Sequence, residues 1–101
     1  MATKLTPNQT ATTLSPTEKT IRDFLLEEIL YDKQLADLGP QELLLENELM
    51  DSISILQTVA FCEQIFEISI PEEELLPDHF ETVRAIGQLV ERRIADKRAQ
   101  Q

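Results

Sequence analysis

The chain has 101 residues and a formal net charge of −10, values that fit one small acidic domain. From Gln34 to Val83 there are twelve acidic residues and no Lys or Arg, a charge pattern that repels phosphates and argues against a nucleic-acid partner. The same field favours partners with basic patches. The alternative is that the acids only keep a small protein in solution.

Cys62 is the only cysteine, so neither an intramolecular disulfide nor a CxxC metal pair is available. This usage fits a reducing compartment. The first residues contain no secretory apolar stretch, and the chain has no run of about 18 apolar residues that would span a membrane. We therefore expect a cytoplasmic protein with no membrane partner.

Residues 1–14 contain five threonines and almost no apolar periodicity, and are predicted to be a disordered tail. Ser15-Pro16-Thr17-Glu18 then has the form of a capping box with proline at the first helical position, which predicts a helix start. The helix should end near Tyr31–Lys33. Its apolar stripe is expected to consist of Ile21, Phe24, Leu25 and Ile29.

Residues 34–50 are predicted to form a long connection, broken at Leu38-Gly39-Pro40 because a proline disfavours helix in the residue before it. Its leucines are too apolar for a free linker, so some of them should pack onto the core. These are Leu43, Leu44, Leu45 and Leu49.

A second helix is predicted from about Ser52 to Phe66, and a last helix from about Thr82 to Ala95, with a short irregular helical turn at Leu75–Phe80 between them. The core-facing side of the second helix is expected to include Leu56, Val59, Cys62, Ile65 and Phe66. The inward positions of the last helix are expected to be Val83, Ile86, Leu89, Val90 and Ile94. The chain should therefore be an all-α, small four-helix bundle with three longer helices, one short helix and a long first loop.

Asp51-Ser52-Ile53 is the strongest candidate site. A serine at the start of a helix is exposed and lies beside unpaired backbone donors, where a phosphate ester is electrostatically favourable. Asp51 is close enough in sequence to position a metal ion or orient a reactant. The alternative is that Ser52 only caps the helix, which is a common role for a serine in this position.

The flanking segments resemble those of the acyl carrier protein family, which includes the peptidyl carrier proteins. They are Leu49-Met50-Asp51-Ser52-Ile53, Glu63-Gln64-Ile65-Phe66, Ile68-Ser69-Ile70-Pro71 and Phe80-Glu81-Thr82-Val83-Arg84-Ala85-Ile86. The resemblance covers about residues 17–95. It implies a carrier domain over residues 15–96, in a bundle of acyl-carrier type, followed by a flexible end at 97–101.

The resemblance also implies a chemistry. Ser52 would receive 4′-phosphopantetheine from coenzyme A, added by a phosphopantetheinyl transferase with a divalent metal, and Asp51 would assist this priming. The thiol of the arm would carry an acyl or aminoacyl group as a thioester. The chain would then be a free-standing, non-catalytic carrier with no metal site of its own. Its further partners would be an acyl- or aminoacyl-loading enzyme and a downstream synthase, condensing or tailoring enzyme.

Two positions depart from the family pattern. Many members have a glycine shortly before the Asp-Ser pair, whereas this chain has none, and Asn47 is expected to adopt the unusual backbone angles instead. Ile53 replaces the commoner leucine. Both residues are apolar, so we expect Ile53 to contact a partner as that leucine would.

The second helix bears on the pathway. Between Ile53 and Phe66 it contains a single acid, Glu63, and its exposed side is expected to offer partners an uncharged surface of Ile53, Leu56, Gln57 and Ala60. This is more similar to carriers of polyketide or nonribosomal-peptide biosynthesis than to those of fatty-acid synthesis. A fatty-acid carrier and a cofactor-free acidic helical interaction module remain the alternatives.

Three other residues are weaker candidates. His79, the only histidine, is expected to be a surface residue rather than a general base. Cys62 should be a buried, inert thiol. Thr58 and Cys62 lie near the expected core, where ordinary packing is favoured over a role in sheltering an acyl chain.

Overall fold

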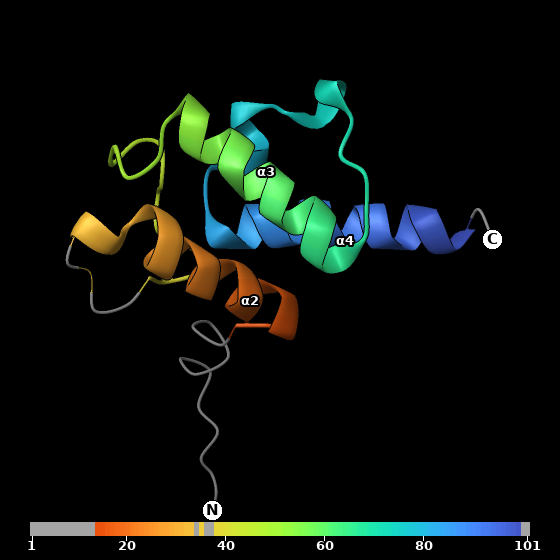
Figure 1. Cartoon of the computed structure of the whole chain (residues 1–101), viewed down its shortest axis with the longest axis horizontal. Coiled ribbons are helices and arrows are strands. Elements are labelled where there is room, and N and C mark those ends of the chain that lie inside the picture. Colours follow the sequence, from red (N-terminus) through yellow and green to blue (C-terminus); the bar gives the residue numbers. More distant parts are fainter. Residues whose placement is uncertain (1–13, 34, 36–37, 100–101) are drawn as a thin grey trace, which may run out of the picture.

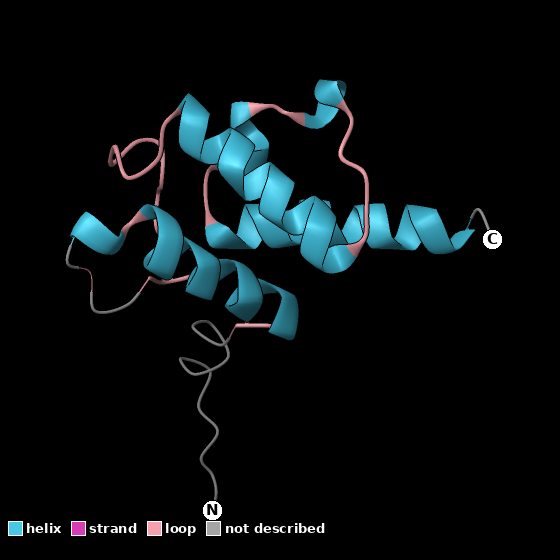
Figure 2. Cartoon of the chain, in the orientation of Figure 1, coloured by secondary structure: helices cyan, strands magenta, loops and turns pink. Residues whose placement is uncertain are grey.

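A computed structural model describes residues 14–33, 35 and 38–99 of the chain (Figure 1). Of the expected disordered tail 1–14, only Leu14 is among the described residues, and it packs against the core. Residues 100–101 of the expected flexible end also lie outside the described part. Within the described residues the protein is all-helical and has no strand (Figure 2). None of the described helices is both long and apolar enough to cross a membrane.

The first helix begins where the capping box predicts. Helix α2 spans Pro16–Phe24, and Ser15 Oγ accepts a hydrogen bond from the Glu18 N–H at 3.1 Å while Glu18 Oε1 accepts one from the Ser15 N–H at 2.9 Å. The helix continues as a π-helical turn over Leu25–Ile29 and ends in a 3₁₀ turn at Tyr31–Lys33. Its expected stripe is confirmed, since Ile21 and Leu25 are fully buried and Phe24 and Ile29 are partly buried.

Helix α3 spans Ser52–Phe66, as predicted. The expected core-facing side is correct for Val59 and Cys62 but wrong for Leu56 and Ile65, which are 58% and 51% exposed. The reason is that apolar residues occupy nearly all sides of this helix, so periodicity does not define the buried side. Thr58 is fully buried in their place, with its hydroxyl donating to the Ser54 carbonyl at 2.8 Å.

Helix α4 spans Val83–Ala99 and is one turn longer than predicted. The expected inward residues are confirmed: Val83, Ile86, Leu89 and Val90 are buried, and Ile94 is partly buried against the core. The extra turn is held by Lys97, whose ammonium donates to the Glu67 carbonyl. Residues 97–99, which were expected to be flexible, therefore belong to the helix.

The three helices pack against one another, with α3 crossing in front of α4 and α2 lying beside both (Figure 1). The connection after the first helix is fastened to the start of α4, because the Leu44 N–H donates to the Glu81 carbonyl at 2.8 Å and the Arg84 N–H donates to the Pro40 carbonyl at 2.9 Å. Leu44 is fully buried, as expected for this segment, whereas Leu43 faces solvent. Two 3₁₀ turns, Glu72–Glu74 and Pro77–Phe80, connect α3 to α4.

Candidate functional site

The N-terminus of α3 presents the Asp51–Ser52 pair. Asp51 is the cap residue, with an extended backbone and a carboxylate that accepts the Ser54 N–H at 2.9 Å. Ser52 is the first helical residue and is exposed. The alternative in which Ser52 serves as the cap is therefore wrong, because the preceding aspartate has that role.

The N-terminal end of α3 stabilises the negative charge of Asp51. The hydrogen bonds from Ser54 lower the pKa of the Asp51 carboxyl below its ordinary value, so the cap is charged at neutral pH. The N–H groups of Ser52 and Ile53 precede the first intrahelical bond, which runs from the Ile55 N–H to the Asp51 carbonyl. The Ser52 residue is exposed, and its hydroxyl has no hydrogen-bond partner among the described residues.

The backbone of Leu44 fastens the loop before the site. The Leu44 carbonyl accepts the N–H groups of Leu49 at 2.8 Å and Met50 at 3.1 Å, and Met50 is buried. Since Leu44 is also bonded to the start of α4, the loop fixes the entry of the chain into α3. Asp51 and Ser52 are thus positioned by contacts with the core rather than by a free linker.

The left-handed residue in this loop is Glu48, with φ 59°, and not Asn47 as expected. The Asn47 N–H donates to the Leu43 carbonyl in a helical turn, and its side-chain amide donates to Glu42 at 2.8 Å. The left-handed conformation occurs one residue later, where the chain leaves this turn. A glutamate therefore occupies a backbone conformation that glycine adopts without strain.

The exposed side of α3 carries the four residues expected to contact partners. Ile53 and Leu56 are 67% and 58% exposed, and Gln57 and Ala60 are exposed beside them. The carboxylate of Glu63, the single acid of the helix, accepts a hydrogen bond from the Ile70 N–H at 2.9 Å and is therefore engaged within the protein. Sequence reasoning missed this contact, which joins residues on either side of a left-handed turn at Glu67.

A hollow of about 370 Å³ lies beside the cap. It separates the end of the first helix from the loop, with Asp32 and Lys33 on one side and Glu48 and Asp51 on the other. Most of its charged groups are acidic. Groups of three or more His, Cys, Asp or Glu side chains that could hold a metal ion do not occur in the described ranges.

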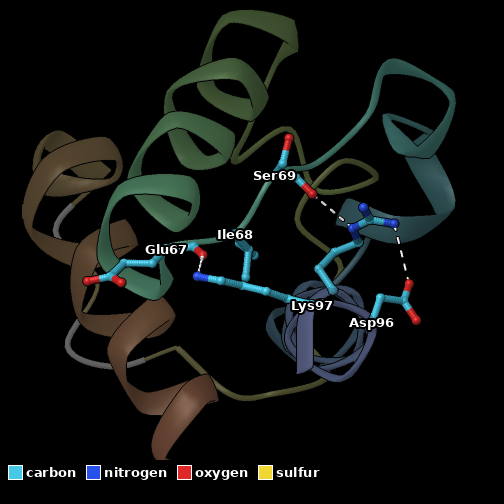
Figure 3. A pocket seen from close by; sticks show the side chains of 6 residues that line it. Glu67, Ile68, Ser69, Asp96 and Lys97 are labelled. Atoms are coloured by element: carbon cyan, nitrogen blue, oxygen red, sulfur yellow. Dashed lines mark hydrogen bonds and ion pairs between the residues drawn. The ribbon is translucent and has the colours of Figure 1, made fainter. Parts of the chain in front are cut away.

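A second polar hollow, of about 360 Å³, lies at the opposite end of α3 (Figure 3). Arg93 and Lys97 reach into it from α4, but both are engaged with backbone: Arg93 donates to the Ser69 carbonyl at 2.8 Å and Lys97 donates to the Glu67 carbonyl. Arg93 also pairs with Asp96 at 3.5 Å. These contacts fasten α4 to the segment after α3, so the basic side chains of this hollow have a structural role.

The weaker candidates are placed away from this chemistry. Burial, and then repulsion by Glu63, raise the pKa of the Cys62 thiol to about 12, so the expected inert thiol is confirmed. Cys62 packs in the core. The His79 Nδ1–H donates to the Glu74 carbonyl at 2.7 Å, and Glu74 in turn lies 3.6 Å from Arg92. His79 therefore joins the two 3₁₀ turns, and Glu74 connects them to Arg92 of α4.

No protein-family model matches the chain, and no curated protein shows significant similarity to it. The resemblance to acyl carrier proteins therefore depends on the motif residues alone and stays a prediction.

Proposed function

We propose that this chain is a free-standing acyl carrier protein, in an acyl-carrier type of four-helix bundle, that tethers acyl or aminoacyl intermediates as thioesters on a 4′-phosphopantetheine arm at Ser52. One observation carries the proposal. The Ser52 hydroxyl is exposed and has no partner in the described part of the chain, at the first residue of a helix that the neighbouring aspartate caps.

The residues present fit the proposed group. A phosphate ester on Ser52 Oγ would be close to the N–H groups of Ser52 and Ile53, which precede the first intrahelical bond at the N-terminal end of the helix dipole. In the priming step the Ser52 oxygen bonds to a phosphorus of coenzyme A, the pyrophosphate P–O bond breaks, 3′,5′-ADP leaves, and the hydroxyl proton passes to the transferase. When bound, the arm would supply a thiol that could carry an acyl group as a thioester.

The chain contributes position rather than catalysis. The hydrogen bonds of Leu44 hold the loop against the start of α4, so the serine is presented from a fixed helix end. Tethering an intermediate there raises its effective concentration at each partner enzyme. The partners are then a phosphopantetheinyl transferase, a loading enzyme and a downstream synthase, condensing or tailoring enzyme.

The uncharged exposed side of α3 supports polyketide or nonribosomal-peptide biosynthesis over fatty-acid synthesis. Glu63 is bonded to a backbone N–H, so contacts by Ile53 and Leu56 dominate that surface. Ile53→Asp or Leu56→Glu should leave the fold intact, because both side chains face solvent, and should slow loading by the partner enzyme. Normal loading of these variants would show that partners contact another face.

Priming is the direct test. The full chain is incubated with coenzyme A, Mg²⁺ and a broad-specificity phosphopantetheinyl transferase, and its intact mass is measured. The proposal requires the added mass of one phosphopantetheine, absent in Ser52→Ala and retained in Ser69→Ala, which changes an exposed serine away from the start of α3. Failure of several competent transferases would favour the acidic interaction module, and modification of Ser52→Ala would place the attachment elsewhere.

A further inference from the structure

A groove lies between the first helix and α3, and one acidic residue lines it. We name it the Phe24–Phe61 groove after the two half-buried rings that line it, which stack with centroids 4.1 Å apart and an interplanar angle of 14°. Its volume is about 360 Å³. The polar groups along it are Glu28, Gln57 and Gln64, and Ala60 leaves room between the two glutamines.

Glu28 gives the groove its charge preference. Its carboxylate is exposed and has no ion-pair partner among the described residues. Helix α3, on the other side of the groove, cannot supply one because residues 34–83 contain no Lys or Arg. An apolar side chain entering the groove would take water from this carboxylate without replacing its hydrogen bonds.

We infer that the Phe24–Phe61 groove binds an arginine side chain of a partner protein. A guanidinium is planar and weakly hydrated, so it lies against aromatic rings more readily than a lysine ammonium does. Two of its N–H groups can pair with the Glu28 carboxylate, while others reach the amide oxygens of Gln57 and Gln64. The aliphatic stem of the arginine then covers the apolar lining.

The groove also leads toward the attachment serine. Ile29 lines both this groove and the hollow beside Asp51, and along α3 the distance from Ser52 to Ala60 is about 12 Å at the rise of an α-helix. A partner anchored in the groove is therefore held beside Ser52. This role, docking the enzyme that acts at Ser52, rests on the proposed carrier function, whereas binding of arginine by the groove does not.

The test is an NMR titration of the ¹⁵N-labelled full chain with the peptide Ac-Ala-Arg-Ala-NH₂, and with Ac-Ala-Gln-Ala-NH₂ as the uncharged control. The arginine peptide should give saturable shifts concentrated at the amides of Phe24, Gln57, Phe61 and Gln64. Glu28→Gln should weaken its binding by about threefold to fivefold. Glu27→Gln removes a neighbouring exposed acid outside the groove lining and should leave binding unchanged.

Ala60→Leu should abolish the shifts by filling the groove, and circular dichroism checks that this variant is folded. The inference is overturned if the arginine peptide perturbs the groove no more than the glutamine peptide does, or if Glu27→Gln weakens binding as much as Glu28→Gln. Intact mass after priming is measured on the same samples. Priming at Ser52 without arginine binding refutes the groove alone, and arginine binding without priming refutes the carrier function alone.

Discussion

Replacing Glu48 by glycine should stabilise the protein. Glu48 has φ 59°, and an L-residue in this left-handed region carries a cost of roughly 1–2 kcal/mol. Glycine removes that cost but adds about 0.5–1 kcal/mol of chain entropy to be lost on folding. The Glu48 side chain has no hydrogen bond or ion pair within the described ranges, so the substitution loses no such contact. The free energy of unfolding should rise by about 0.5–1 kcal/mol.

Urea unfolding followed by far-UV circular dichroism measures this change, and thermal unfolding should show a Tm higher by about 2–8 °C. Two neighbouring substitutions serve as controls, because neither Glu46 nor Asn47 has a positive φ. In Glu46→Gly the free energy of unfolding should fall by about 0.5–1 kcal/mol. In Asn47→Gly it should fall further, because this substitution also removes the hydrogen bond from the side-chain amide to Glu42. A loss of stability in Glu48→Gly, or an equal gain in Glu46→Gly, would refute the assignment of backbone strain to Glu48.

Three further predictions concern the core and the helix cap. A Gly→Ala change inside a helix ordinarily stabilises it by about 1 kcal/mol, but in Gly87→Ala the new Cβ would lie 2.9 Å from Glu18 Cγ. Urea unfolding should therefore show a free energy of unfolding lower by about 1 kcal/mol. Adding Glu18→Ala to the same chain should remove the clash. Because hydrogen bonds from Ser54 lower the pKa of Asp51 below 3.8, its charged-cap stability is present above that pH and is lost as the pH falls through the lowered pKa. The Tm difference between wild type and Asp51→Asn should therefore shrink in acid, and a constant difference down to pH 2 would contradict this. Burial, and then Glu63, raise the pKa of Cys62 to about 12, so at pH 8 it should react with a disulfide reagent only as fast as the protein opens. Equal reaction rates for the native and the urea-unfolded protein would contradict its burial.

The helix starts were predictable because their signals are local. The capping box at Ser15–Glu18 satisfies donors within a single turn, and Asp51 caps α3 through a bond to Ser54 three residues later. Such contacts form between residues that are already neighbours in the chain. The starts of α2 and α3 therefore follow from a few residues each.

The buried side of α3 was not predictable in the same way. Apolar residues surround this helix, so its periodicity does not choose between Leu56, which is exposed, and Thr58, which is fully buried. The choice is made by packing against α2 and α4. The length of α4 is also non-local, because Lys97 stabilises its last turn through a carbonyl thirty residues earlier.

The candidate site also combines a feature indicated by local sequence with one that depends on non-local contacts. The serine was proposed from Asp51-Ser52-Ile53 and its flanking segments, whereas the neutrality of the surface beside it depends on a contact across a turn. Glu67 adopts a left-handed conformation, with φ 55°, and the chain then returns so that the Ile70 N–H meets the Glu63 carboxylate. With Glu63 engaged, the exposed side of α3 has only apolar and amide side chains to offer, and the nearest unpaired acid along the groove belongs to the first helix, at Glu28. Shape and apolar contact at Ile53 and Leu56 would then decide how a partner lies on α3, while Glu28 would select for an arginine at its edge.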